Sequence, residues 1–243
     1  MAKTYVLVHG AWLGAWCWER VIPYLEAEGN KVVAVDLPGH GENKANIADQ
    51  NMETYTQYVV DVLKQQEGKV ILVGHSMGGM SISQAASRIP ERVEKLVYVT
   101  AFLPLDGQSN DGLEDGIKPT DWRTMAKQGI AVTLDETETI SEMIPEAAMA
   151  LLYNDIPEEE AKEEVKRLGK ETMNSQYQAV HLSEAFNALP KVYVKCLVDT
   201  IMLPEMQDKM IGLTPCQEVY SLEAGHSPYR SKPKELAEIL LKL

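Results

Sequence analysis

The chain has 243 residues, 45% of them hydrophobic, and its 23 basic and 36 acidic side chains give a net charge of −13 at neutral pH. A hydrophobic fraction of this size supports a full core and excludes a disordered chain, and the length fits one α/β domain with a modest insertion. The negative charge argues against nucleic acid or an anionic membrane surface as a partner, and it favours neutral substrates.

Strand-like segments alternate with helix-like segments along most of the sequence. We predict strands over residues 5–8, 32–35, 70–73, 96–100, 192–196 and 218–222, and helices over residues 16–28, 54–66, 76–88 and 233–243. The first four strands are nearly continuous apolar runs, which is typical of parallel strands covered on both faces. This alternation with short connections predicts a mostly parallel, doubly wound α/β sheet of about six strands.

The sequence Gly74-His75-Ser76-Met77-Gly78 has the form G-x-S-x-G of a nucleophile elbow and lies between a predicted strand and a predicted helix. In this context the serine occupies a strained turn that presents its hydroxyl to the substrate, while side chains at Gly74 and Gly78 would collide with neighbouring elements. The N-terminus of the helix offers unpaired N–H groups to a developing negative charge. We therefore predict that Ser76 is a nucleophile.

Residues 104–185 interrupt the alternation of strands and helices. The segment has glycines and acidic residues near its start, a weak strand-like run at 131–134, and then helical patterns. One helix is expected between Asp155, as its N-cap, and Gly169, as its terminator, with Pro157 in the first turn. A long insertion of this kind usually covers a site. We predict a mainly helical cap over residues 104–185, inserted into a core made of residues 1–103 and 186–243.

A serine hydroxyl becomes an effective nucleophile when a histidine accepts its proton and an acid orients that histidine. In hydrolases with this elbow the order along the chain is serine, acid, histidine. His226, in a loop after the last predicted strand, is the histidine that follows every candidate acid. Asp199 is the preferred acid, because it follows the strand at 192–196 and ligands gather at the carboxyl ends of parallel strands. Asp106 is the alternative.

Attack on a carbonyl group creates negative charge on its oxygen, which two N–H donors can stabilise. We predict that these donors are the backbone N–H groups of Met77, directly after the nucleophile, and of Ala11, in the loop after the first strand. Gly10 allows this loop to approach the elbow closely, and His9 is expected to brace the loop. The mechanism needs no metal ion and no organic cofactor.

Six short motifs are spread along the chain. They are His9-Gly10-Ala11-Trp12, Gly14-Ala15-Trp16-Cys17-Trp18, Asp36-Leu37-Pro38-Gly39-His40-Gly41, Gly74-His75-Ser76-Met77-Gly78-Gly79, Phe102-Leu103-Pro104 and Gly225-His226-Ser227-Pro228. Together they are similar to those of the α/β-hydrolase superfamily, and within it the chain resembles the methylesterase and hydroxynitrile lyase group of small serine esterases. The resemblance covers nearly the whole chain, although the cap carries no matching motif. It implies the α/β-hydrolase fold, a Ser76-His226-Asp199 triad, and oxyanion donors at Ala11 and Met77.

Two positions separate the activities within this group. The hydroxynitrile lyases carry a threonine at the position of Gly10, and a lysine directly after the catalytic histidine, where this chain has Ser227. The resemblance therefore implies hydrolysis of a small-molecule ester. A hydroxynitrile lyase, a ligand receptor with slow turnover and a lactonase are the alternatives that the sequence leaves open.

The substrate pocket is expected between the elbow and the cap. The predicted walls are Trp12, Phe102, Trp122 and Met125, and the residues predicted beside the nucleophile are Gly10 and Ser227. An apolar pocket of this kind favours small, neutral alkyl or aryl esters. The tryptophan and methionine side chains of the cap could also serve a contact in a homodimer.

No segment has the roughly 18 to 20 apolar residues that a membrane span requires. The N-terminal segment is too short for a signal-peptide core before the first predicted strand. Cys17, Cys196 and Cys216 do not have the spacing of a metal site and are expected to be free thiols in a reducing compartment. These observations predict a cytoplasmic protein.

Overall fold

A parallel sheet of six strands forms the centre of the computed structural model, which describes residues 2–110 and 122–243. The strands are β1 (Thr4–Val8), β2 (Lys31–Val35), β3 (Val70–Ser76), β4 (Val93–Ala101), β8 (Lys191–Cys196) and β9 (Glu218–Leu222), in the order β2-β1-β3-β4-β8-β9. All neighbouring pairs are parallel. The predicted doubly wound sheet is therefore confirmed. The order reverses between β1 and β3, and ligands bind at such reversal points in open α/β sheets.

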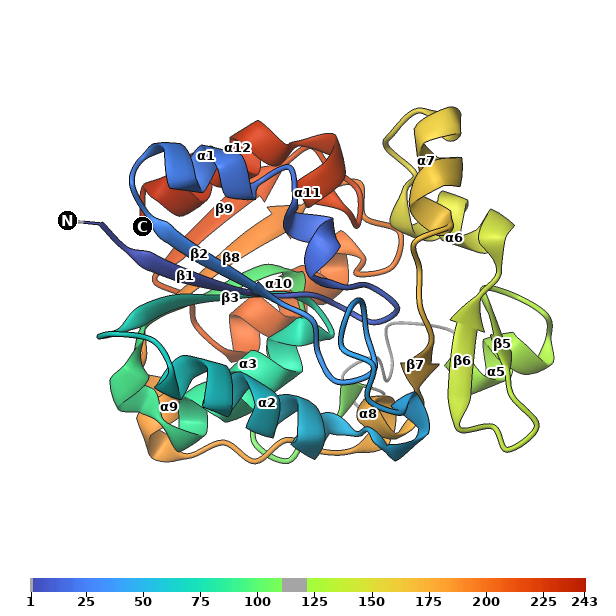
Figure 1. Cartoon of the computed structure of the whole chain (residues 1–243), viewed down its shortest axis with the longest axis horizontal. Coiled ribbons are helices and arrows are strands. Elements are labelled where there is room, and N and C mark those ends of the chain that lie inside the picture. The colour runs from blue at the N-terminus through green and yellow to red at the C-terminus, as the bar shows by residue number, and fades with distance from the viewer. Residues whose placement is uncertain (1, 111–121) are drawn as a thin grey trace.

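Helices cover both faces of the sheet (Figure 1). One face is covered by α2 (Met52–Lys64), α3 (Gly78–Arg88), α9 (Glu184–Ala188) and α10 (Pro204–Leu213), and the other by α1 (Ile22–Ala27), α11 (Pro228–Ser231) and α12 (Pro233–Leu241). Successive side chains of a strand point to opposite faces, so Val6 and Val8 pack in the first layer while Tyr5 and Leu7 pack in the second. Burial on both faces explains the continuous apolar runs of these strands.

Two helix boundaries differ from the prediction, each for a local reason. The predicted helix over residues 16–28 is a 3₁₀ turn (Ala15–Trp18) followed by the six-residue helix α1, where Pro23 lies in the first turn and costs no hydrogen bond. Helix α2 begins at Met52, two residues before its predicted start, because Asn51 and Thr54 form a capping box. Each side chain accepts a hydrogen bond of 3.0 Å from the other residue's N–H.

The cap lies beside the carboxyl ends of the central strands, at the right of Figure 1. Among the described residues, its helices are α5 (Trp122–Lys127), α6 (Pro145–Leu152), α7 (Glu158–Val165) and α8 (Asn174–Tyr177). It also contains an antiparallel sheet of β5 (Val132–Leu134), β6 (Ile140–Met143) and β7 (Glu171–Thr172), in that order. The weak strand-like run at 131–134 corresponds to β5, but the sequence predicts neither β6 nor β7, which have only four and two residues.

Two residues predicted as boundaries of a cap helix instead hold loops of the core. The residue before α7 is Pro157, and Asp155 does not cap the helix. The Asp155 carboxylate accepts a hydrogen bond from the Gly225 N–H at 2.6 Å, directly before His226. The Gly169 N–H donates to the Trp12 carbonyl oxygen at 2.8 Å. These contacts fix the cap to the two loops that carry predicted site residues.

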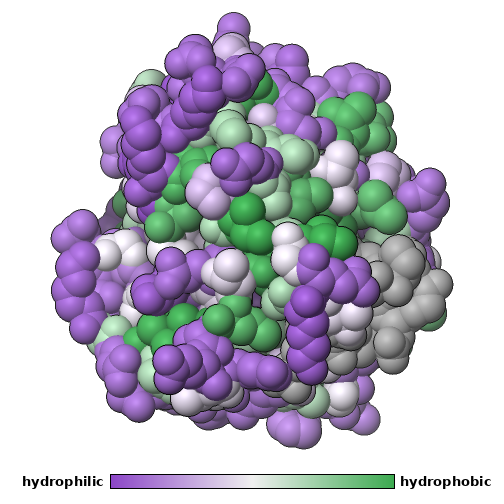
Figure 2. Space-filling view, turned by 90° about the vertical axis from the view of Figure 1, so that its right-hand side faces the viewer, coloured by the Kyte–Doolittle hydropathy of each residue, from purple (hydrophilic) through white to green (hydrophobic). Residues whose placement is uncertain are grey.

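The face on the cap side carries hydrophobic residues in small groups separated by hydrophilic side chains (Figure 2). Ile130, in the loop before β5, is 50% exposed, and Leu105 is 39% exposed. Within residues 2–110 and 122–243, no helix combines the length and hydropathy that would carry it across a bilayer.

A carboxylate of the cap is completely buried against the core. Glu171, in β7, accepts hydrogen bonds from the Tyr55 hydroxyl at 2.8 Å, from the Ser175 hydroxyl at 3.1 Å and from the Thr172 N–H at 2.9 Å. Its second oxygen lies 3.1 Å from Nε2 of the buried His40. A completely buried carboxyl group needs all these hydrogen-bond partners, because water cannot take their place.

Replacing Glu171 with alanine is expected to lower the free energy of unfolding by about 3–5 kcal/mol, the usual cost of breaking a buried polar network. The change leaves Tyr55 and His40 without an acceptor. Urea unfolding would measure the effect. The matched control is Glu142→Ala, because Glu142 lies in the same small sheet and pairs with Lys170 on the surface, where ion pairs contribute little. Equal unfolding midpoints for the two variants would contradict this expectation.

Candidate active site

The predicted nucleophile lies at a strained turn between β3 and α3. Ser76 has a φ of 51°, a left-handed conformation that residues other than glycine rarely adopt. Both flanking glycines are required by close packing. A Cβ atom at Gly74 would lie 2.9 Å from the Gly78 carbonyl oxygen, and one at Gly78 would lie 2.6 Å from the His9 carbonyl oxygen. This geometry is that of a nucleophile elbow.

The structure brings Ser76, His226 and Asp199 into one hydrogen-bonded chain. His226 Nε2 lies 3.0 Å from the Ser76 hydroxyl oxygen, and His226 Nδ1 lies 2.8 Å from Asp199 Oδ2. All three side chains are buried, and the serine is 8% exposed. The alternative acid, Asp106, is on the surface and accepts a hydrogen bond from the Leu182 N–H. The chain of contacts has the order and spacing of a serine, general base and orienting acid.

The Asp199 carboxylate is held by four donors. In addition to His226, it accepts from the Thr100 hydroxyl at 2.5 Å and from the N–H groups of Ile201 and Met202 at 2.8 and 2.9 Å. Burial alone raises the pKa of this carboxyl group, but the His226 ring and the hydrogen bonds outweigh it and hold the pKa below its usual value. Asp199 is therefore ionised and orients His226 Nδ1–H. The sequence does not reveal the contribution of Thr100.

His75, inside the elbow, supports the backbone of His226. Its Nε2–H donates to the His226 carbonyl oxygen at 2.7 Å, and the two rings lie 4.8 Å apart. Burial, together with the neighbouring His226, lowers the pKa of His75 to about 3. A neutral His75 is therefore a fixed donor. The motif identifies Ser76, but nothing local in the sequence indicates this second role of the elbow.

The loop after β1 is held by hydrogen bonds to its peptide groups. His9 Nε2 accepts from the Leu37 N–H at 3.0 Å, so its Nδ1–H donates to the Gly10 carbonyl oxygen at 2.7 Å. That carbonyl group shares a planar peptide bond with the Ala11 N–H, so fixing one fixes the direction of the other. The next residue, Trp12, has a φ of 61°. The bracing role expected of His9 thus acts on the peptide that carries a predicted oxyanion donor.

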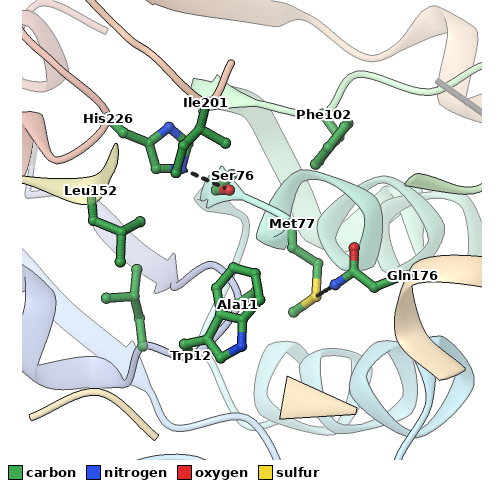
Figure 3. A pocket seen from close by; sticks show the side chains of 10 residues that line it. Ala11, Trp12, Ser76, Met77, Phe102, Leu152, Gln176, Ile201 and His226 are labelled. Atoms are coloured by element: carbon green, nitrogen blue, oxygen red, sulfur yellow. Dashed lines mark hydrogen bonds between the residues drawn. The ribbon is translucent and has the colours of Figure 1, made fainter. Parts of the chain in front are cut away.

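A small cavity lies beside Ser76 (Figure 3). Its walls include the predicted residues Ala11, Trp12, Met77 and Phe102, together with Leu13, Leu152, Gln176 and Ile201, which the sequence analysis does not name. Leu152 and Gln176 come from α6 and α8, so the cap closes the cavity. A Cβ atom at Gly10 would lie 2.7 Å from the Ser76 Cβ, which places this glycine against the nucleophile.

Two predicted pocket residues have other positions, and the structure does not describe the side chain of a third. Among the described residues, the wall of the cavity includes neither Met125 nor Ser227. Met125 lies half-buried in α5. Ser227 is buried, and its hydroxyl is 2.9 Å from the Tyr229 hydroxyl, so its position after His226 does not direct it to the cavity. Trp122 begins α5, and its side chain lies outside the described residues.

Comparison with known proteins agrees with this geometry. Residues 5–239 match the model of the alpha/beta hydrolase family. The chain belongs to this family. Methylesterase 17 of Arabidopsis thaliana is 30% identical, with 98% of this chain and 90% of the relative covered, and methylesterase 7 of the same plant is 32% identical, with 99% and 96% covered. The predicted resemblance to the methylesterase group is thus confirmed, and this α/β hydrolase is a carboxylesterase-type enzyme.

Solved structures support the same assignment. A pyrethroid hydrolase from Sphingobium faniae has a TM-score of 0.86 at 28% identity, with 100% of this chain and 97% of that chain covered. An Arabidopsis methylesterase has a TM-score of 0.82 at 27% identity, with 99% and 98% covered. Polyneuridine aldehyde esterase, at 24% identity and a TM-score of 0.87, shares the fold of this α/β hydrolase over the whole chain.

The neutral histidines are expected to make stability depend on pH. Burial lowers the pKa of His75 to about 3 and that of His9 well below its usual value. In the unfolded chain both bind protons near pH 6.5, so the free energy of unfolding decreases as the pH falls below that value, by up to about 1.4 kcal/mol per pH unit for each histidine. Urea unfolding between pH 7.5 and 5 would measure the slope.

The control for this effect is His75→Gln, whose side chain can donate a hydrogen bond but does not titrate. The variant is expected to show a smaller slope than the wild type between pH 6.5 and 5. Identical slopes for the two proteins would mean that His75 does not contribute.

Proposed function

We propose that this esterase hydrolyses small, neutral carboxylic esters of alkyl or aryl type through an acyl-enzyme. The observation that carries the proposal is the chain of contacts from Ser76 through His226 to the ionised Asp199, at the mouth of a mostly apolar cavity. The mostly apolar wall of this cavity suits a neutral ester. The methylesterases and the pyrethroid hydrolase among its relatives support ester cleavage.

In the first half of the reaction, His226 Nε2 accepts the Ser76 proton while the serine oxygen bonds to the ester carbonyl carbon. The former carbonyl oxygen becomes negative and accepts hydrogen bonds from the Ala11 and Met77 N–H groups. His226 then donates its proton to the leaving alkoxide. The C–O bond breaks, an alcohol leaves, and the acyl group remains on Ser76.

In the second half, His226 accepts a proton from water as the water oxygen attacks the acyl carbon. Collapse of the second tetrahedral intermediate breaks the bond to Ser76, which recovers its proton from His226 and releases a carboxylic acid. Throughout the cycle, Asp199 remains ionised and stabilises the charged His226 ring. The Thr100 hydroxyl and two N–H groups keep the carboxylate in place.

The hydroxynitrile lyase alternative is not supported by the residues at the two positions that distinguish the lyases, Gly10 and Ser227. The lyases of this group have a threonine where this chain has Gly10, and here a Cβ atom would meet the Ser76 Cβ at 2.7 Å. They also have a lysine where this chain has Ser227, a buried hydroxyl paired with Tyr229. Neither position offers a group that could assist a leaving cyanide.

Ser76→Ala is expected to reduce the kcat for p-nitrophenyl acetate and butyrate at least 1,000-fold, because it removes the nucleophile and leaves only oxyanion stabilisation and binding. Steady-state release of p-nitrophenol measures this. Ser81→Ala is the matched control, since Ser81 lies one turn further along α3 and donates to the Gly78 carbonyl oxygen. Equal rates for the wild type and Ser76→Ala would contradict the assignment and favour a receptor.

Asp199→Asn is expected to lower kcat by about 10⁴-fold while the protein stays folded, because a neutral amide no longer fixes the tautomer of His226. The same ester assay measures the change, and circular dichroism verifies the fold. Asp208→Asn is the control, since Asp208 forms an exposed pair with Lys195. A loss of less than 10-fold would remove Asp199 from the triad.

A further inference from the structure

One polar side chain of the cavity wall has no part in the proposed reaction. Among the described residues, the wall consists of Ser76, His226, apolar side chains and Gln176, which comes from α8 of the cap and is 5% exposed. In Figure 3 its amide nitrogen points toward Met77, the residue directly after the nucleophile. An amide in such a wall costs free energy unless its donors and acceptor find partners.

The Gln176 oxygen is well paired, but the nitrogen is not. Oε1 accepts from Asn110 Nδ2 at 3.0 Å. Nε2 lies 3.5 Å from the Met77 sulfur and 3.4 Å from the Ser175 hydroxyl oxygen. The distance to the Ser175 oxygen exceeds that of a normal N–H···O bond, and a thioether is a weak acceptor. Two N–H donors are therefore only weakly bound at the wall of the cavity.

The orientation of the amide follows from its neighbours. The single hydroxyl hydrogen of Ser175 is directed to oxygen acceptors, since the Thr172 carbonyl oxygen lies at 2.8 Å and a Glu171 carboxylate oxygen at 3.1 Å. The Ser175 oxygen therefore presents lone pairs to Gln176, and the group that faces lone pairs is the NH₂ group. The buried network that holds Glu171 thus also sets which end of Gln176 faces Met77.

We propose that Gln176 selects substrates, by donating a hydrogen bond from Nε2 to an oxygen acceptor on the ester, such as a keto group separate from the scissile carbonyl. The inference rests on the proposed function, because it takes the cavity as the ester site. An ester that carries the acceptor satisfies the weakly bound donors. An ester of the same shape without this oxygen covers the N–H donors with apolar surface and leaves them unpaired. Its binding free energy is therefore less favourable in both the ground state and the transition state.

The test compares matched esters that differ in one oxygen. Methyl 3-oxobutanoate, 4-oxopentanoate and 5-oxohexanoate are paired with methyl 3-methylbutanoate, 4-methylpentanoate and 5-methylhexanoate, in which a methyl group replaces the keto oxygen. For at least one pair, the wild type is expected to show a kcat/KM about 10-fold higher for the keto ester, the value of one added hydrogen bond. Acid release at constant pH measures the rates without a chromogenic group.

The decisive variant is Gln176→Met, which keeps the length of the side chain and removes the donor. It is expected to reduce the ratio for that pair to about 1, and thermal unfolding verifies that it folds. Gln178→Met is the matched control, because Gln178 accepts from the Glu53 N–H outside the cavity wall, and it should keep the wild-type ratio. A ratio near 1 for every pair in the wild type, or an unchanged ratio in Gln176→Met, would overturn the inference.

A binding measurement separates this inference from the proposed function. In the Ser76→Ala background, NMR titration of each keto ester and its methyl-branched partner measures binding without turnover. Tighter binding of the keto ester that disappears on adding Gln176→Met would support the role of Gln176, even if the wild type hydrolysed none of these esters and the proposed function failed. Equal binding of both esters to both proteins would overturn the inference, even if all the esters were hydrolysed.

Discussion

The strained backbone at Ser76 is the constraint on which the rest of the site depends. A left-handed residue of this kind costs of order 1–3 kcal/mol and persists only where its surroundings determine it fully. Here those surroundings are two glycines packed against neighbouring backbone, the sheet pairing of β3 with β1 and β4, and the start of α3. Because the turn is fixed, the Ser76 hydroxyl needs no rearrangement to meet His226.

Local signals in the sequence were enough for the core of the site and its fold. The elbow is recognisable because its glycines and its strand and helix are contiguous, and the order of Ser76, Asp199 and His226 is the one expected in hydrolases with this elbow. The supporting contacts could not be predicted, because they join segments far apart in the chain. Examples are the contact of Thr100 with Asp199 and that of His75 with the His226 carbonyl group. Ser227 was wrongly predicted to line the pocket, because a position next to His226 in the chain does not determine where the side chain points.

The cap was the least predictable region, and the reason is physical. Its sheet includes a strand of only two residues, too short for any periodicity to appear. Asp155 and Gly169 look like ends of a helix, yet they bind Gly225 and Trp12 of the core. A buried ion pair adds to these contacts, since Arg230, after His226, pairs with Glu164 of α7. The cap therefore forms part of the support of the catalytic loops as well as the wall of the cavity.

The pairing of His75 with the His226 carbonyl group has a consequence for the use of sequence patterns. In the pattern G-x-S-x-G, each x stands for any amino acid, but neither position is free in this protein. The first, His75, supplies a neutral side-chain donor to the loop that carries His226. The second, Met77, has its sulfur within hydrogen-bond distance of Ser175 and Gln176 of the cap. Both variable positions of the motif thus connect the elbow to segments far from it in the chain: the loop of His226 and the cap.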